Sequence, residues 1–212
     1  MFGGSGNDSI YGGNEVAATA TTTNDQINAG AGNDSVNGQQ GNDALVGGAG
    51  NDSVYGGQGR DTINGGADAD SISGDIGDDS LLGDGGLDTL TGGAGNDSFG
   101  GVAGDFGTSA SNTAGQTSFE TISAFQAGLD KIDLATAGTA ANYTELTPAA
   151  SFNAALVDAN AAFAGTAALI YITATVGSDT YLFIDEDIGV TADGVIKLTG
   201  ITTDSLSFSD FV

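Results

Sequence analysis

The sequence predicts an all-β protein: a parallel solenoid of short strands, followed by a small β-rich C-terminal capping region with one helix. Three observations predict it. A nine-residue unit repeats from residue 3 to residue 100, one position of the unit is always Asp, and another is always apolar. A short fixed period is typical of solenoids, because each unit buries its apolar side chain only against neighbouring units. We therefore divide the 212-residue chain into a repeat region, 1–100, and a C-terminal region, 101–212.

The repeating unit reads Gly3-Gly4-Ser5-Gly6-Asn7-Asp8-Ser9-Ile10-Tyr11 in its first copy. Eight further units follow one another without a gap over residues 29–100. Residues 12–28 form one longer unit, whose extra stretch 14–23 we expect to be a surface loop, because lengthening a loop costs little closure entropy. The chain thus carries ten units in nearly continuous register.

Two positions of the unit carry the same kind of residue in every copy. Position six is Asp in all ten units: Asp8, Asp25, Asp34, Asp43, Asp52, Asp61, Asp70, Asp79, Asp88 and Asp97. Position eight is apolar in all ten: Ile10, Ile27, Val36, Leu45, Val54, Ile63, Ile72, Leu81, Leu90 and Phe99. The Gly positions are looser, with replacements at Ala29, Gln39, Asp68, Asp75 and Asp84.

This spacing suggests a turn of six residues and a strand of three. Gly, Asn and Asp tolerate positive φ and favour turns. In the strand the middle side chain points one way and its neighbours the other, so one apolar residue per strand faces inward. Such short strands need partners, and we expect two parallel sheets that face each other across the apolar column. Units n and n+2 then lie about 4.8 Å apart.

The aspartates of units n and n+2 should therefore be close neighbours. Rows of carboxylates at this separation repel one another unless cations lie between them. Ca²⁺ suits such a place, because it takes six to eight oxygen ligands in a flexible shell, main-chain carbonyls included. Mg²⁺ fits less well, and soft metals are disfavoured without Cys or His. The alternative is a metal-free solenoid in which Asp only makes Asx turns; Asn or Ser would serve such turns equally well without charge.

The unit at 47–55, Gly-Gly-Ala-Gly-Asn-Asp-Ser-Val-Tyr, resembles the glycine-rich nonapeptide repeat of RTX proteins. The resemblance implies a right-handed parallel β-roll with Ca²⁺ between successive turns, held by position-six Asp side chains and turn carbonyls. It implies one site per n, n+2 pair, at most about eight ions in all. The pairs are Asp8 with Asp34, Asp25 with Asp43, Asp34 with Asp52, Asp43 with Asp61, Asp52 with Asp70, Asp61 with Asp79, Asp70 with Asp88, and Asp79 with Asp97.

The C-terminal region has less Gly and longer apolar runs. We expect a linker at 102–117, a helix at 151–164, and strands at 121–125, 131–134, 168–174, 181–184 and 195–198, with a hairpin turn at 177–179. Its expected role is to cap the open end of the solenoid. The stretch from 121 to 134 resembles the segment that follows the roll in serralysin-type and related type I-secreted proteins.

Two short segments leave alternatives open. The tail Ser209-Asp210-Phe211-Val212 resembles the C-terminal ends of type I secretion substrates, and a plain final strand would explain it equally well. The acidic cluster Asp185-Glu186-Asp187 is either a solvated strand end or a calcium site of its own.

Composition excludes several classes of function. The chain has 28 Asp and Glu against 3 Lys and Arg, a formal net charge of −25, and no His, Cys or Trp. Disulfide scaffolds, thiolate or imidazole zinc sites and Ser-His-Asp triads lack their residues. A nucleic-acid interface lacks its cations. A glycosidase cleft would need stacking aromatics, and no run of about 18 apolar residues occurs that could cross a membrane.

The sequence thus predicts a non-enzymatic, calcium-binding folding module of a secreted bacterial protein. We expect it to act outside the cell or at its surface, supporting type I export and a surface layer or matrix. The alternatives are the folding and export domain of a secreted enzyme, such as a serralysin-like metalloprotease, or the distal end of an RTX adhesin. The expected partners are calcium, the type I secretion machinery, and either further copies of the chain or a cell-surface polysaccharide.

Overall fold

The computed structural model describes residues 1–12, 24–100, 120–133, 143–145, 171–184 and 194–201, and the single residues Ala149, Ala154, Ala155, Ala159, Ala162, Leu206 and Asp210. The chain divides into two compact units, Met1–Gly100 and Gly101–Val212. Each unit is taken by itself below. In the described ranges, no helix has the length and apolarity needed to cross a bilayer.

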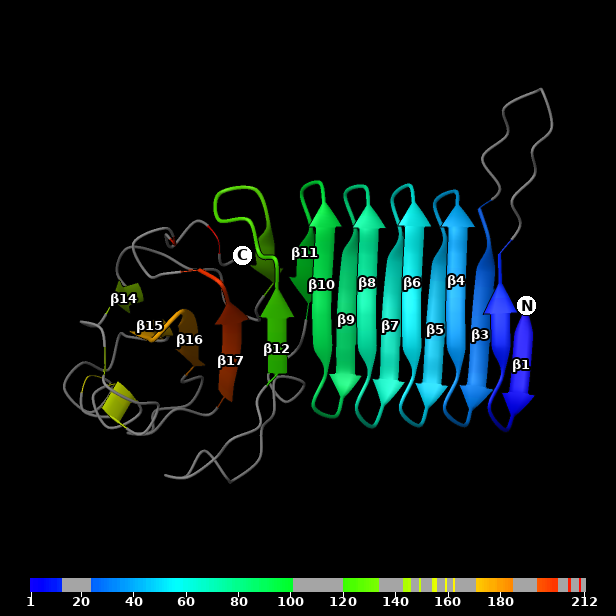
Figure 1. Ribbon diagram of the computed structural model, residues 1–212, viewed down its shortest axis with the longest axis horizontal. Coiled ribbons are helices and arrows are strands. Elements are labelled where there is room, and N and C mark those ends of the chain that lie inside the picture. The colour runs from blue at the N-terminus through cyan, green and yellow to red at the C-terminus, as the bar shows by residue number, and fades with distance from the viewer. Residues whose placement is uncertain are drawn as a thin grey trace. The chain divides into compact units, whose positions relative to one another are not determined.

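The first unit, which we call the roll, consists of strands in two parallel sheets (Figure 1). Its strands are β1 (Phe2–Ser5), β2 (Ser9–Tyr11), β3 (Gln26–Ala31), β4 (Ser35–Gln40), β5 (Ala44–Ala49), β6 (Ser53–Gln58), β7 (Thr62–Ala67), β8 (Ser71–Ile76), β9 (Ser80–Gly85), β10 (Thr89–Ala94) and β11 (Ser98–Gly100). One sheet runs β1-β3-β5-β7-β9-β11, and the other runs β2-β4-β6-β8-β10. Every strand therefore pairs with the strand two units along the chain.

The register places equivalent residues of units n and n+2 side by side. Leu45 of β5 lies opposite Ile63 of β7, which in turn lies opposite Leu81 of β9. From Ile27 to Phe99 the position-eight side chains are at most 2% exposed, and only Ile10, at the N-terminal end, is less buried. The predicted all-β class, the parallel β-roll and the single apolar column are all confirmed.

The predicted division of each unit into a six-residue turn and a three-residue strand is wrong. Most strands are six residues long, as in β6, and the turns shrink to three residues, such as 59–61. The reason is that the first two glycines of a unit continue the strand. Gly48 of β5 pairs with Gly66 of β7 in the parallel ladder, so glycine here serves close approach of the strands as well as turning.

Left-handed backbone recurs at positions two and four of the unit. Four of the non-glycine residues at these positions adopt it: Gln39, Asp68, Asp75 and Asp84, with φ between 68° and 76°. These are four of the five residues that replace Gly in the sequence. Asp tolerates this conformation better than most residues, because its short side chain can hydrogen-bond locally.

The second unit contains β12 (Glu120–Ser123), β13 (Lys131–Asp133), β14 (Tyr143–Glu145), β15 (Tyr171–Val176), β16 (Asp179–Ile184) and β17 (Gly194–Thr199). Five of them form a mixed sheet in the order β14-β15-β16-β17-β12. The predicted hairpin is confirmed: β15 and β16 pair antiparallel from Tyr171 opposite Ile184 to Val176 opposite Asp179. Its turn begins at Gly177, whose φ of 69° suits glycine.

A hydrophobic cluster in this second unit combines residues from several elements. It consists of Ala155, Ala159, Ile172, Ala174, Tyr181, Phe183 and Val195. Ala154, Ala155, Ala159 and Ala162 are helical, in agreement with the predicted helix, and the rest of 151–164 lies outside the described residues. The predicted loop at 14–23, the linker at 102–117 and the acidic cluster 185–187 also lie outside them.

Candidate metal centre

The position-six aspartates lie at the end of each turn of the roll, directly before a strand. The two residues that follow each aspartate begin that strand. The period of the repeat therefore places all of these aspartates on the inner side of a turn. From Asp34 to Asp97 the eight aspartates are at most 4% exposed, whereas Asp8 and Asp25 at the N-terminal end are partly buried. The sequence therefore lines the inside of the roll with acidic groups, which are almost never fully buried without a partner.

One carboxylate oxygen of each pair bridges two units. The Oδ1 atom of Asp52 accepts a hydrogen bond of 2.8 Å from the backbone N–H of Asp34, and Asp61 accepts one of 2.8 Å from Asp43. The same contact joins Asp8 to Asp34, Asp25 to Asp43, Asp52 to Asp70, Asp61 to Asp79, Asp70 to Asp88, and Asp79 to Asp97, at 2.7–3.0 Å. The structure brings together all eight pairs that the sequence predicts to be neighbours.

The second oxygen of these carboxylates has a different environment. The Oδ2 atoms are buried and accept no hydrogen bond in Asp8, Asp34, Asp43, Asp52, Asp61, Asp70 and Asp79. A buried carboxylate oxygen without a donor or a counter-ion is costly. Hydrogen-bonded turns account for Oδ1 but leave Oδ2 unexplained, and a cation would satisfy it.

Glycine at position one makes room for these oxygens. A Cβ atom on Gly56 would lie 2.4 Å from Oδ2 of Asp61 and 2.8 Å from the carbonyl oxygen of Gly74. On Gly47 it would lie 2.5 Å from Oδ2 of Asp52 and 2.6 Å from the carbonyl oxygen of Gly65. Carboxylate and carbonyl oxygens, the two kinds of protein ligand that Ca²⁺ prefers, thus lie against the same glycine at Gly38, Gly47, Gly56, Gly65 and Gly74.

Side chains alone do not complete a coordination shell. Within the described part of the chain, no group of three or more acidic side chains converges on one point. The residues fit Ca²⁺ only if two aspartates of a pair act together with main-chain carbonyls. This is the arrangement that the RTX resemblance implies.

Burial sets the proton affinity of the stacked position-six aspartates, which we call the aspartate ladder. Loss of hydration raises the pKa of Asp70 and Asp79 to about 7 and that of Asp61 to about 6, with the charges of neighbouring aspartates adding to the effect. Backbone hydrogen bonds to the carboxylates act in the opposite direction and do not cancel it. Loss of hydration likewise raises the pKa of Asp88, to about 6. Without a cation, the middle of the ladder resists full ionisation at neutral pH.

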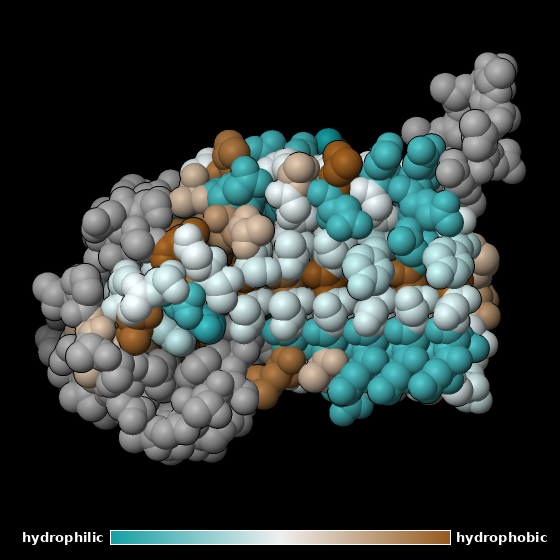
Figure 2. Space-filling model, viewed as in Figure 1, coloured by the Kyte–Doolittle hydropathy of each residue, from teal (hydrophilic) through white to brown (hydrophobic). Residues whose placement is uncertain are grey.

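A second ladder, of asparagines at position five, escaped the sequence analysis. Oδ1 of Asn7 accepts a hydrogen bond of 2.9 Å from the N–H of Asn33, and Oδ1 of Asn33 accepts one of 3.1 Å from Asn51. In the same way, Oδ1 of Asn24 accepts a hydrogen bond from the N–H of Asn42, and Oδ1 of Asn42 accepts one from the N–H of Arg60. These bonds run in the opposite direction to those of the aspartates, so each pair of turns is joined both ways. Hydrophilic residues gather along the edges of the roll where its turns lie (Figure 2).

The signal for this ladder was present in the sequence. Position five is Asn in the units of Asn7, Asn24, Asn33, Asn42, Asn51 and Asn96. It is Arg60, Ala69 and Leu87 in three of the remaining units, which cannot accept such a bond. The column is therefore less regular than the Asp column.

A family model of calcium-binding repeats matches the part of the chain that carries these aspartates. The family described as RTX calcium-binding nonapeptide repeat (4 copies) matches residues 1–15, 19–54, 38–72, 46–81, 55–90 and 73–105. Among solved structures, the AlgE6R3 subunit of the Azotobacter vinelandii mannuronan C5-epimerase is 24% identical and has a TM-score of 0.51, covering 76% of this chain and 77% of that one. The extracellular lipase LipA of Serratia marcescens is 15% identical with a TM-score of 0.34, covering 89% of this chain and 38% of that one. No curated protein matches the chain.

Proposed function

Because the repeat region of this chain belongs to the RTX calcium-binding nonapeptide repeat family, we propose that the roll is a module whose folding is driven by calcium. The observation that carries the proposal is the row of buried Oδ2 atoms without hydrogen-bond partners. Those of Asp43, Asp52, Asp61, Asp70 and Asp79 lie close to glycine carbonyls that could complete the shell of a hard cation. The ligands would be the position-six aspartates and main-chain oxygens of neighbouring turns.

The energetics favour a roll that folds only when calcium is bound. One large buried apolar side chain per unit is little to offset the entropy lost when nine residues are ordered. A bound ion stabilises the folded state by about 1.4 kcal/mol when its concentration is ten times the dissociation constant. The eight aspartate pairs would then contribute on the order of 11 kcal/mol. Coupling between neighbouring units makes the transition cooperative.

This behaviour suits a protein that is exported unfolded and folds outside the cell. Extracellular modules bind calcium with dissociation constants of roughly 10⁻⁴ to 10⁻³ M, far above the free calcium of a cytosol. The proposal therefore includes type I export and a place outside the cell or on its surface. It also includes a non-enzymatic, surface-layer or matrix role, with the second unit as the cap of the roll.

The alternative is a folding and export domain that belongs to a secreted enzyme. A solved subunit of an epimerase shares the fold, which keeps this alternative open. It differs from the structural role in assembly: a matrix protein associates with itself or with surface polysaccharide, and an export domain remains a monomer. Negative-stain microscopy with millimolar calcium separates them, because sheets or filaments favour the matrix role and dispersed particles favour the export domain.

The direct test is a calcium titration of the full chain followed by far-UV circular dichroism. We expect a disordered signal in EDTA, a cooperative gain of β signal between about 0.1 and 1 mM calcium, and reversal by EDTA. Magnesium at the same concentration is the control and should produce little change, because it retains its waters. An identical β signal in EDTA and in calcium would refute the proposal.

A further inference from the structure

Two Asn-Gly bonds in the roll carry the inference. The sequence contains this dipeptide twice, at Asn37-Gly38 and at Asn64-Gly65. Both have Asn at position nine of one unit and Gly at position one of the next, and they lie within β4 and β7. An asparagine before glycine loses its side-chain amide most readily, because glycine has no Cβ to shield its nitrogen and its backbone bends freely.

The folded roll holds the Asn37–Gly38 peptide group in place. The carbonyl oxygen of Asn37 accepts a hydrogen bond of 2.8 Å from the N–H of Gly12, which follows β2. On its other side, Asn37 lies opposite Tyr55 in the parallel pairing of β4 with β6. The peptide group is therefore fixed between two neighbouring strands of the same sheet.

The glycine of each pair has no room to move. Gly38 is buried, and a Cβ atom on it would lie 2.6 Å from the carbonyl oxygen of Gly56 and closer still to Oδ2 of Asp43. Gly65 is buried against Oδ2 of Asp70 in the same way. The glycine nitrogen therefore cannot swing toward the asparagine side chain without displacing the oxygens of the candidate calcium site.

We propose that Asn37 and Asn64 are sites of spontaneous deamidation in the calcium-free chain, and that the folded roll protects them. In the unfolded chain the backbone nitrogen of Gly38 loses its proton to solvent and attacks Cγ of Asn37. The new N–C bond closes a succinimide ring, while the C–N bond of the side-chain amide breaks and the nitrogen leaves as ammonia with a proton from solvent. One water then opens the ring to aspartate or isoaspartate, and nothing is oxidised or reduced.

Isoaspartate would harm the roll more than aspartate, because its main chain runs through the side-chain carbon and is one atom longer. In β4 the extra atom falls between Asn37 and Gln39, both of which pair with residues of β6. A longer backbone forces a bulge or a shift of register, and Gly38 would move away from Asp43. Time spent without calcium would thus leave units that no longer fold. This link to calcium rests on the proposed function, and the chemistry at the two bonds does not.

Peptide mapping by mass spectrometry tests the proposal on the full chain, aged at slightly alkaline pH in EDTA or in saturating calcium. The peptides of Asn37 and Asn64 should gain the mass of an amide-to-acid conversion at least about tenfold faster in EDTA, because unfolding exposes both bonds. Asn28 is the matched control, since it also occupies position nine but precedes Ala29. In EDTA its peptide should convert at least about tenfold more slowly than that of Asn37.

Two outcomes of this mapping would overturn the proposal. One is equal conversion in EDTA and in calcium when circular dichroism shows that only the EDTA sample is unfolded. The other is equal conversion of Asn28 and Asn37 in EDTA, since the glycine would then have no part in the reaction.

Recovery of the fold after ageing tests the consequence. Wild type aged in EDTA and returned to calcium should regain less β signal than a fresh sample. The variant that combines Asn37→Gln and Asn64→Gln should regain all of it, because glutamine closes a less favourable ring. Asn28→Gln is the control variant and should age as wild type does. Equal losses in the double variant and in wild type would contradict the proposal.

Circular dichroism of the same samples separates this proposal from the proposed function. A roll that keeps its β signal in EDTA refutes calcium-driven folding, and deamidation is then compared between urea and buffer. Fast conversion of Asn37 and Asn64 in urea with slow conversion in buffer would support protection by the fold. Slow conversion in the unfolded chain would overturn it.

Discussion

The two units of this chain bury carboxylates in opposite ways. The roll stacks them in rows, and at six positions, from Asp34 to Asp79, Oδ1 is hydrogen-bonded to a neighbouring unit while Oδ2 has no donor. The second unit gives Asp210 a backbone donor and a lysine, and Asp179 a lysine. Its hydrophobic core also combines residues from several elements, whereas the roll has a single column of large buried apolar side chains, one from each unit. A fold that leaves its buried charge unpaired depends on an external counter-ion, and a fold that pairs it internally does not.

Removal of calcium should show this difference between the two units most strongly. In EDTA at neutral pH, we expect the amides of 24–100 to exchange at the rate of an unfolded chain, with a loss of on the order of 11 kcal/mol. The hairpin of β15 and β16 should retain protection, because its hydrogen bonds and core do not involve the aspartate ladder. Exchange resolved by peptide measures both at once. Equal loss of protection in the two units would show that the second unit depends on the roll.

Acid should partly replace calcium in the roll. The pKa of Asp61, Asp70 and Asp79 in the folded state is about 6 to 7, above the ordinary value of 3.8. The folded state therefore binds more protons between pH 4 and 7, so the calcium-free roll loses stability as pH rises through this window, by on the order of a few kcal/mol in sum.

Circular dichroism in EDTA at pH 4.5 and pH 7.5 measures this effect, and the β signal should be larger at pH 4.5. In saturating calcium the order should reverse, because protons compete with the ion for the same oxygens. A calcium-free signal that grows with pH would contradict the assignment of burial as the cause of the shifts.

The effect of Asp61→Asn on the stability of the roll should change sign when calcium is added. The amide keeps the oxygen that accepts from the Asp43 N–H and removes a buried charge, so the calcium-free roll should gain stability. In calcium the variant weakens the two pairs that Asp61 forms, with a loss of up to about 3 kcal/mol. The β signal in EDTA and urea unfolding in calcium, both at pH 7.5 where the wild-type carboxyl is ionised, measure the two effects. Asp78→Asn, in the exposed ladder of position five, is the control and should show neither effect.

Gly56→Ala should have the smallest of these effects. The added methyl group would lie 2.4 Å from Oδ2 of Asp61, and we expect a loss of about 1–3 kcal/mol from the forced displacement. Gly85→Ala is a matched control in the same roll, because its Cβ would meet only a carbonyl oxygen at 3.8 Å. Thermal unfolding in calcium compares the two variants. Equal midpoints would mean that the glycine of position one does not make room for the carboxylate.

Much of the roll could be predicted because its interactions repeat with the sequence. The Asp and apolar columns led to the pairing of units n and n+2 and to all eight aspartate contacts. The length of the strands could not be predicted from the same pattern. Gly47 and Gly48 read as turn residues, yet Gly48 pairs with Gly66 in the ladder, because a glycine without a side chain suits a strand wherever two backbones must approach.

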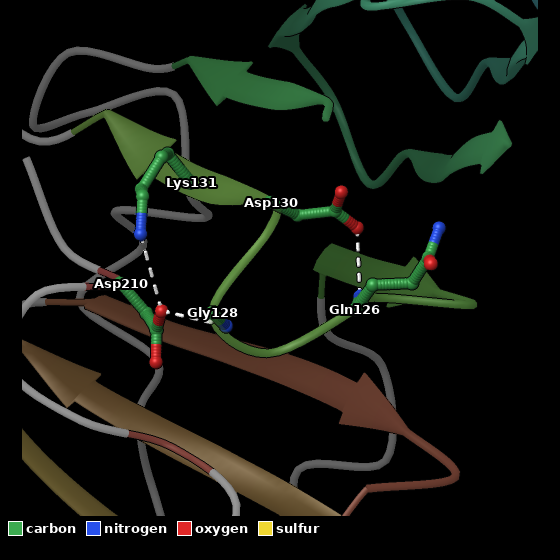
Figure 3. Close-up of polar contacts among 5 residues, drawn as sticks. All are labelled: Gln126, Gly128, Asp130, Lys131 and Asp210. Carbon is green, nitrogen blue, oxygen red and sulfur yellow. Dashed lines mark hydrogen bonds and ion pairs between the residues drawn. The ribbon is translucent and has the colours of Figure 1, made fainter. Parts of the chain in front are cut away.

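The contact between Lys131 and Asp210 lay beyond sequence reasoning for a different reason. Lys131 and Asp210 are 79 residues apart and belong to no repeat, so nothing in the sequence links them. The tail around Asp210 resembled an export signal or a final strand, and the structure places Asp210 in a 3₁₀ turn. Its partners, Gly128 and Lys131, become neighbours of Asp210 only in the folded chain (Figure 3).

By itself the sequence determined the period, the parallel pairing and the acidic interior of the roll, since nearest-neighbour contacts in a solenoid follow directly from a nine-residue repeat. The tertiary structure alone decided which carboxylate oxygen is bonded and which is left without a donor. It also decided where the second unit obtains the donors for its own buried aspartate. Both depend on the direction of individual side chains and on contacts between distant segments, which no local pattern of residues encodes.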